Sequence, residues 1–413
     1  MKSKTGSKAW IIGFFLIILI GCLSYMYVCF HANPLGYFTN ELGIEWYSSD
    51  DYTRSIKAKY ILAHKDEIEG VIIGGSKAGA LDVDLLEEYT GHKYYNMYFN
   101  SGNFSDYLAY TRFLVEQTNV KEITVHLSSF EAKSFSRAYR GNNFELPAVV
   151  TSGKVGQALE FLQYLMTDYK TMLKARESRP KTIVKNRDLL SDGMRNRRRV
   201  TLKFMKDPDA YVTYLLRDFD QCMERLFSEY AAYTYDNYAL NLNALREMKQ
   251  MCDEKGVELK LMIGASFLND HFQYEWSGYY NYMADLVGIM GEVWDFSDYN
   301  DINMNPYNFY DRKHYSRTVS NLMIRTMYGA DKREGFGILL TNDNIYEYLE
   351  KRKADYQALK EEYETTGTVQ LQGMEDDSFL PWEPAPTWDM SEDGVEPDDP
   401  EENEASGDEN DEG

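Results

Sequence analysis

A serine in a turn of small residues stands where a strand is expected to end. The run from Gly70 to Gly75 reads Gly-Val-Ile-Ile-Gly-Gly and predicts a short buried strand, with Ser76 directly after it and helix-like sequence behind. Such a turn lets a serine hydroxyl project above a sheet, beside helix N-terminal amides that stabilise an anion. The pattern therefore fits a nucleophile, although a serine that only caps the helix gives the same pattern.

A histidine and an aspartate form the second chemical element, far downstream. The chain has six histidines, and His314 lies three residues after Asp311, just before the last expected helix. Imidazole can take the proton of an attacking serine hydroxyl near neutral pH, and a carboxylate can orient the ring and stabilise the imidazolium. The alternative is structural, with Asp311 as a helix N-cap and His314 as an ordinary packed histidine.

Other kinds of chemistry find little support in the sequence. There is no Cys-x-x-Cys motif and no His/Cys cluster with zinc spacing, so we expect no metal and no cofactor. The net charge of −22 belongs mostly to the C-terminal tail, because Glu375 to Gly413 holds 17 acidic residues and no Lys or Arg. The remainder is near neutral without a uniformly basic surface, so we expect no nucleic-acid partner. Whether Cys222 and Cys252 pair is left open.

The elements that would position the site alternate between strand and helix. Strand-like runs are expected at 70–75, 93–99, 121–127, 257–263 and 292–296, and helix-like segments at 106–117, 242–255, 279–290 and 316–328. This alternation predicts an α/β fold with a doubly wound, mainly parallel sheet in a three-layer sandwich. Ligands of such sheets bind at the carboxyl ends of the strands, where Ser76 would stand.

The N-terminus is expected to anchor the protein in a membrane. Residues 1–8 carry three lysines, and residues 9–30 form an uncharged, mostly apolar run long enough to span a bilayer. Basic residues on the short leading side favour a cytoplasmic N-terminus, so the rest of the chain would lie outside the cell. An alternative is lipidation at Cys22, which ends the run Leu-Ile-Gly-Cys; a cleaved secretory signal has less support.

Composition sets the remaining boundaries. Residues 31–56 are expected to form a juxtamembrane stalk, and residues 57–330 the α/β domain, with a helical insertion at about 135–235. The insertion holds a run of basic residues between Lys170 and Lys203. That run is either a solvated surface or a patch that faces anionic lipid headgroups or an anionic wall polymer.

The C-terminal region divides into two parts. Residues 331–366 are expected to contribute an apolar strip and an amphipathic helix. Residues 367–413 form an acidic tail that cannot bury enough apolar surface to fold alone, so we expect it to be disordered. Trp382 and Trp388 are its two expected docking points.

Together, the two chemical motifs resemble those of a known superfamily. Gly74-Gly75-Ser76 after the first strand and Asp311 to His314 before the last helix are similar to the first and last sequence blocks of the SGNH (GDSL-like) hydrolases. The resemblance extends over about residues 57–330 and implies a flavodoxin-like three-layer sandwich. It is closest to membrane-anchored members that accompany membrane-bound O-acyltransferases and teichoic-acid D-alanylation.

Carried over by position, this resemblance implies roles for the site residues. Ser76 would be the nucleophile, His314 the base and Asp311 its orienting acid. The Ser76 and Gly102 backbone N–H groups would line an oxyanion hole.

Two positions depart from the family pattern. Gly75 stands where the first block usually has Asp. The third block reads His-Leu-Ser-Ser-Phe from His126 and lacks the Asn that normally donates to the oxyanion, a role that Ser128 would have to fill. Loss of one oxyanion donor costs about 10²–10³ in rate.

These observations predict a membrane-anchored extracellular serine esterase or O-acyltransferase that works through an acyl-serine intermediate. Its substrate would be a cell-envelope polysaccharide or teichoic acid, so its partners would be an envelope glycopolymer or an acyl donor, and through the resemblance a membrane-bound O-acyltransferase. The alternative is a catalytically weak or silent accessory protein of an envelope acyltransferase complex. Three aromatic residues near the site (Tyr98, Phe99 and Tyr315) could stack on sugars, although core packing is the favoured interpretation.

Overall fold

The computed structural model of this chain divides into two compact units. The described residues are 4–33, 37–38, 53–100, 102–128, 146–151, 153–177, 192–195, 197–217, 235–267, 276–311, 313–371 and 380–384. The smaller unit comprises Met1–His64 and Gly141–Ser191, and the larger one Lys65–Arg140 and Asp192–Gly413. Ser76, Asp311 and His314 therefore belong to the same unit.

The larger unit is built on a six-stranded sheet in the order β2-β1-β3-β4-β5-β6. These strands are β1 (Gly70–Gly74), β2 (Tyr94–Tyr98), β3 (Glu122–Leu127), β4 (Glu258–Ile263), β5 (Glu292–Asp295) and β6 (Ile338–Thr341). Strands β1 to β5 are parallel, whereas β6 pairs antiparallel with β5. The α/β class and the mainly parallel sheet are thus confirmed. The direction of strand addition reverses between β1 and β3, which is where sheets of this kind bind ligands.

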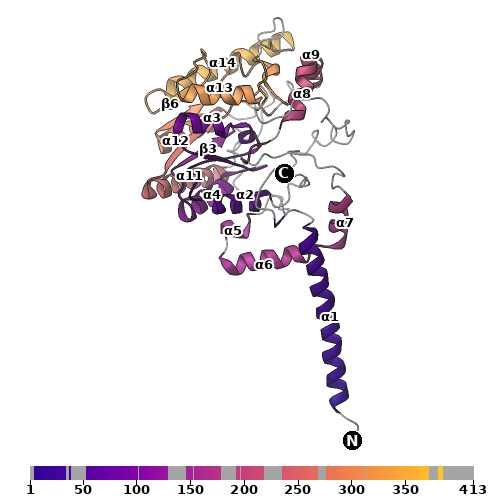
Figure 1. Ribbon diagram of the computed structural model, residues 1–413. Coiled ribbons are helices and arrows are strands. Elements are labelled where there is room, and N and C mark those ends of the chain that lie inside the picture. The colour runs from indigo at the N-terminus through magenta and orange to yellow at the C-terminus, as the bar shows by residue number, and fades with distance from the viewer. Residues whose placement is uncertain are drawn as a thin grey trace. The chain divides into compact units, whose positions relative to one another are not determined.

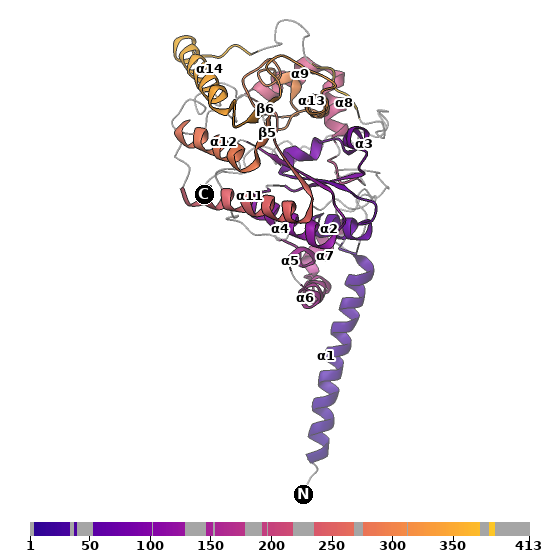
Figure 2. The same cartoon turned by 90° about the vertical axis from the view of Figure 1, so that its left-hand side faces the viewer.

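Helices cover both faces of this sheet (Figures 1 and 2). One face carries α4 (Phe104–Gln117), α11 (Tyr235–Lys255) and α12 (Trp276–Met290), and α11 packs against both of the others. The opposite face carries α3 (Val83–Thr90) and α13 (Arg317–Met327). Because helices cover the sheet on both faces, every residue of β1, β2 and β3 is buried, including the polar side chains of Asn96, Thr124 and His126.

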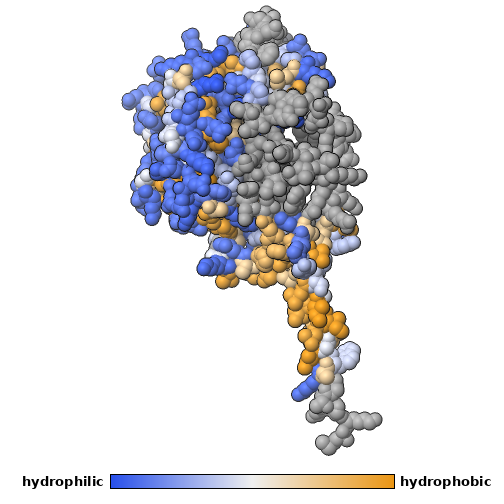
Figure 3. Space-filling model, viewed as in Figure 1, coloured by the Kyte–Doolittle hydropathy of each residue, from blue (hydrophilic) through white to orange (hydrophobic). Residues whose placement is uncertain are grey.

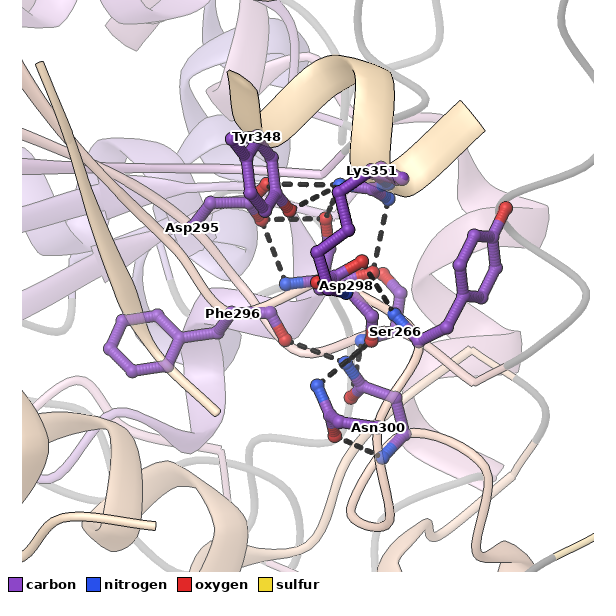
Figure 4. Close-up of polar contacts among 11 residues, drawn as sticks. Ser266, Asp295, Phe296, Asp298, Asn300, Tyr348 and Lys351 are labelled. Atoms are coloured by element: carbon purple, nitrogen blue, oxygen red, sulfur yellow. Dashed lines mark hydrogen bonds and ion pairs between the residues drawn. The ribbon is translucent and has the colours of Figure 1, made fainter. Parts of the chain in front are cut away.

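A buried polar network holds the C-terminal helix α14 (Ile345–Thr366) to the end of β5. Arg352, 1% exposed, donates to the Asp295 carboxylate at 2.9 Å and to the Ser297 carbonyl at 3.0 Å. Figure 4 shows Tyr348 beside Asp295, to which the Tyr348 hydroxyl donates at 2.8 Å. The predicted strip and helix of residues 331–366 correspond to β6 and α14, and this network explains why a mostly charged helix is held in place.

The smaller unit contains α1 (Lys4–Ala32), α2 (Thr53–Ala63), α5 (Ala148–Thr151), α6 (Lys154–Leu165) and α7 (Tyr169–Glu177). Helix α1 is exposed and apolar along most of its length (Figure 3), and Lys8–Ala32 is long and apolar enough to cross a membrane. Lipidation at Cys22 stays a prediction.

The predicted insertion is shared between the two units. Helices α5, α6 and α7 lie in the smaller unit, whereas α8 (Arg198–Lys206) and α9 (Pro208–Leu216) lie in the larger one. The predicted stalk also differs from the structure, because α2 begins at Thr53 and runs across the expected boundary at residue 57.

Part of the acidic tail packs into the larger unit. Trp382 is 6% exposed, stacks on Phe204 with 3.7 Å between ring centroids, and donates its indole N–H to the Tyr307 carbonyl at 2.7 Å. With Val212 and Tyr310 these residues form what we call the Trp382 cluster. Residues 380–384 are thus ordered within a segment predicted to be disordered, because one large aromatic ring supplies the burial that the acidic composition lacks. Trp388 lies outside the described residues.

Candidate active site

The structure brings Ser76, His314 and Asp311 together across 238 residues of sequence. Ser76 Oγ lies 2.7 Å from His314 Nε2, and His314 Nδ1 lies 2.9 Å and 2.8 Å from the two Asp311 carboxylate oxygens. Because an ionised carboxylate only accepts hydrogen bonds, Nδ1 carries the ring proton and Nε2 is left to accept the Ser76 hydroxyl proton. The arrangement matches a nucleophile, a base and an orienting acid.

A tight turn presents the serine. Strand β1 ends at Gly74, and Ser76 begins the 3-10 helix η1 (Ser76–Ala80). A Cβ added at Gly74 would lie 2.6 Å from the Ala78 Cβ and 2.8 Å from the His126 carbonyl oxygen, so only glycine fits where the turn passes β3. Gly75 has φ −71° and ψ −170°, an extended conformation open to any residue, so the backbone does not force the departure from Asp at this position.

The histidine is presented by a loop that is closed at both ends. Phe309 and Tyr315 form an antiparallel bridge, and the Tyr310 N–H donates to the His314 carbonyl at 2.7 Å. Ser316 then caps α13 by accepting from Val319. Within this loop the Asp311 carboxylate faces His314, and it also accepts from the His314 backbone N–H at 2.8 Å.

The charges around the triad favour a neutral imidazole and an ionised carboxyl. Burial lowers the pKa of His314, and the nearby Arg197 and Arg195 lower it further, together outweighing the opposite effect of Asp311. Burial alone would raise the pKa of Asp311, but the charge and hydrogen bonds of His314, with Arg197, hold it well below its usual range. Both groups are therefore in the protonation state that general-base catalysis needs near neutral pH.

The expected oxyanion residues lie at the same edge of the sheet as Ser76, without direct bonds to the triad. Ser128 follows β3, whose residue His126 pairs with Gly74, so Ser128 and Ser76 leave adjacent strands at one end. The Gly102 N–H donates to the Phe99 carbonyl at 3.3 Å, a long and therefore weak bond. Within the described part of the chain, neither Gly102 nor Ser128 is hydrogen-bonded to a triad side chain.

Sequence reasoning missed Lys77, the residue next to the nucleophile. Its side chain is 8% exposed and donates to Ser266 Oγ at 2.9 Å. The Ser266 N–H donates to Asn303 Oδ1, and Asn303 in turn donates to the Phe296 and Asp298 carbonyls at 2.7 Å. Figure 4 shows Ser266 near this loop after β5. The serine turn is thus connected to the loop that leads towards the histidine, through residues with no distinguishing sequence pattern.

His126 is a structural residue rather than a second base. It is 1% exposed, its Nε2 lies 2.9 Å from the Tyr315 hydroxyl, and burial with the charge of Lys77 lowers its pKa to about 3. Gly264 packs so closely that an added Cβ would lie 2.0 Å from His126 Nε2. Tyr315, 1% exposed, is packed in the core together with Tyr98 and Phe99, as expected.

Two arginines of the predicted basic run flank the triad. The Arg195 N–H donates to the Gly79 carbonyl of η1 at 2.9 Å, and the Arg197 guanidinium lies 5.3 Å from the Tyr310 ring centroid. Among the described residues, neither guanidinium forms an ion pair. The part of the basic run nearest the site therefore adds positive charge beside the serine and the aspartate.

No protein-family model matches this chain, and no curated protein shows detectable sequence similarity to it. The superfamily resemblance accordingly depends on the two motifs and on the order of the elements. Among the residues that the structure describes, no group of three or more His, Cys, Asp or Glu side chains is arranged to hold a metal ion.

Proposed function

We propose that this protein is a membrane-anchored serine esterase or O-acyltransferase of the SGNH type. The observation that carries the proposal is the 2.7 Å contact between Ser76 Oγ and His314 Nε2, with Asp311 behind the ring. The strand order β2-β1-β3-β4-β5 and the place of Ser76 at the carboxyl end of β1 support it, because both fit the flavodoxin-like sheet that the resemblance implies.

The triad supports acyl transfer in two steps. Ser76 Oγ attacks an ester carbonyl while His314 Nε2 takes its proton, and His314 then returns that proton to the departing alcohol, which leaves an acyl-serine. Water or a hydroxyl of an acceptor next attacks the acyl carbon and loses its proton to His314, which passes that proton to the Ser76 oxygen as the acyl–serine bond breaks. Asp311 stabilises the imidazolium at each stage.

The charge beside the triad favours an anionic substrate. Arg195 and Arg197 place two positive charges near His314, beside the single negative charge of Asp311. Guanidinium groups bind phosphate and carboxylate through paired hydrogen bonds. Of the two envelope polymers considered above, a phosphate-containing teichoic acid suits this surface better than a neutral polysaccharide.

The location follows from α1 and the lysines before it. An uncleaved span with a cytoplasmic N-terminus would leave the catalytic unit outside the cell, close to envelope polymers. Through the resemblance, a membrane-bound O-acyltransferase is the partner that would hand an acyl group to Ser76.

A second candidate is an accessory protein with little activity of its own. It is favoured by the absence of Asn in the third block and by the Gly102 N–H, which donates to Phe99 rather than standing free for an oxyanion. This candidate predicts the same fold and the same membrane location, but no acyl-enzyme.

The decisive experiment is to trap and locate an acyl-serine. Full-length protein in detergent should release acetate from small acetate esters and, with a fluorophosphonate probe, carry one label on Ser76 by mass spectrometry. Ser76→Ala should abolish labelling, and His314→Ala should slow it strongly. Ser105→Ala, which removes a hydroxyl that donates to Asn103 within the α4 cap, serves as a matched control. Equal ester hydrolysis by wild type, Ser76→Ala and His314→Ala would refute the enzymatic proposal and leave the accessory role.

A further inference from the structure

Helix α6 carries an exposed apolar face that none of the described residues of its own unit covers. The exposed residues follow helical spacing of four, three, four and three, continuing into the start of α7. They are Val155 (77% exposed), Leu159 (61%), Leu162 (45%), Met166 (55%) and Tyr169 (62%), and we call them the α6 stripe. Five large side chains in one stripe form a patch too apolar for a surface that faces only water.

The α6 stripe is not the side on which the helix packs. Tyr164 and Leu165, on other sides of the helix, are 0% and 6% exposed. Tyr164 packs with Tyr37, and Glu160 accepts from the Tyr37 hydroxyl at 3.0 Å. The helix is therefore anchored by its inner side, which leaves the stripe for another occupant.

Contacts with the end of α1 fix where the helix lies. The Tyr25 hydroxyl donates to the Thr167 carbonyl just beyond α6, and the Tyr164 hydroxyl donates to Asn33 Oδ1 at 2.8 Å. In Figures 1 and 2, α6 lies crosswise to α1 at its C-terminal end. In Figure 3 the apolar surface beside α6 adjoins that of α1.

We propose that α6 lies in the outer boundary of the bilayer that α1 crosses, with the α6 stripe inserted among the lipids. The apolar run of α1 ends at Phe30, five residues after Tyr25, which corresponds to a depth of about 7 Å along the helix. In-plane amphipathic helices bury their apolar face about 5–10 Å into this boundary. The contact between Tyr25 and Thr167 places the end of α6 at that depth.

The residues at the ends of the stripe suit the same location. Lys154 precedes it and Lys170 follows it, both exposed, and Tyr169 is itself amphipathic. Tyrosine and lysine are favoured at headgroup level, since they can keep a polar end in water above an apolar stem. Lipid is therefore a better occupant of the α6 stripe than a second protein, because the contact of α6 with α1 already places the stripe at the depth of the membrane boundary. The proposal requires α1 to cross the bilayer but needs no catalytic activity.

Photo-crosslinking from single positions tests the proposal in the full-length protein. A benzophenone amino acid would replace Leu159 in the stripe, Ile17 in the middle of α1, or Gln157, which is exposed and lies about 200° around the helix from Val155. Each protein would be reconstituted in liposomes of phosphatidylglycerol and phosphatidylethanolamine and irradiated. We expect lipid adducts from Ile17 and Leu159, with a yield from Leu159 at least about fivefold above that from Gln157.

Each other outcome counts against the proposal in a distinct way. Adducts from Ile17 but not from Leu159 would overturn the interfacial helix while keeping the anchor. A cross-linked protein dimer from Leu159 would show that a second copy covers the stripe instead. No lipid adduct from Ile17 would remove the membrane span and the interfacial helix together, while leaving the acyl-serine experiment untouched.

Discussion

His314 is held between charges of opposite sign, and this determines how activity should depend on pH. Burial with Arg197 and Arg195 lowers its pKa more than Asp311 raises it. Since only the neutral ring can accept the Ser76 proton, the rate is lost as pH falls through the pKa of His314. We expect kcat/KM for a neutral acetate ester to fall on the acid side with an apparent pKa below about 6.5, the usual value for histidine. An acid limb above that value would contradict this electrostatic balance.

Substitution of Arg195 and Arg197 tests their effect on His314 and on substrate preference. Arg195→Gln with Arg197→Gln should raise the pKa of His314 and so move the acid limb of kcat/KM to higher pH. The same variant should also lower the ratio of kcat/KM for acetylated glycerol phosphate to kcat/KM for acetylated glycerol. The decrease should be roughly tenfold, because each lost charge contact is worth about 0.5–1 kcal/mol. Lys206→Gln removes an exposed charge at the end of α8 and should change neither measurement. A double variant that behaves like wild type would mean that the arginines do not bind substrate.

Asp311 should matter through the orientation and charge of the imidazole. Asp311→Asn replaces an acceptor with an amide that can turn its NH₂ towards Nδ1 and favour the wrong tautomer. Comparable triads lose about 10⁴ in kcat after this change, so we expect a loss of roughly 10³–10⁴ in kcat with KM little altered. Steady-state kinetics would measure it. A loss below tenfold would assign Asp311 to loop structure only, since it also accepts from the backbone N–H groups of Lys313 and His314.

At the scale of helices and strands, local patterns predicted much of the sheet. The run at 70–75 becomes β1 (Gly70–Gly74), whose apolar residues are continuous, and the run at 121–127 becomes β3 (Glu122–Leu127), whose β-branched residues alternate with polar ones. Helix α4 begins at Phe104 rather than at the expected residue 106, since Asn103 and Asp106 form a capping box. The pairing of Ser76 with His314 was a hypothesis from residue chemistry and the superfamily resemblance, since no local pattern links two residues 238 positions apart.

Other parts of the site could not be predicted from the sequence. The bond from Lys77 to Ser266 joins residues 189 positions apart, and neither has a periodicity or motif that points to the other. Trp382 was an expected docking point, but its cluster partners lie on α8, on α9 and in the loop before the histidine. Such partners are determined by tertiary packing, which local patterns do not encode.

Removal of one partner from the buried network under α14 should destabilise the protein strongly. Arg352→Met leaves the Asp295 carboxylate, which is 0% exposed, without its cation, and removal of one partner of a buried pair costs about 3–5 kcal/mol. Lys351→Met is the matched control, because Lys351 is 60% exposed and its contact with the buried Asp298 is long, at 3.5 Å, so its loss should cost less than that of Arg352. Urea unfolding followed by circular dichroism would give both free energies. Equal values for the two variants would mean that α14 is held by apolar packing alone.

For the molecule as a whole, the C-terminal tail has two different parts. Residues 380–384 connect to the catalytic loop, because the Trp382 ring packs edge-on against Tyr310 at 4.7 Å and Tyr310 directly precedes Asp311. The Tyr310 hydroxyl also accepts from the first N–H of α13 at 3.1 Å. After residue 384 the sequence is rich in acidic residues, and Trp388 is its one aromatic residue.

Two truncations should therefore behave differently although both remove most of the acidic residues. A chain that ends after Thr387 keeps Trp382 and should match full-length protein in stability and kcat/KM. A chain that ends after Met374 loses Trp382, which exposes Phe204 and Tyr310; loss of a buried tryptophan costs about 3–5 kcal/mol, and the loosened loop should lower kcat as well. Thermal unfolding and ester hydrolysis would be compared for the two chains. Equal loss of activity in both chains would mean that the acidic tail, rather than the Trp382 contact, supports the site. Full activity in both chains would mean that the catalytic loop is held by its own hydrogen bonds.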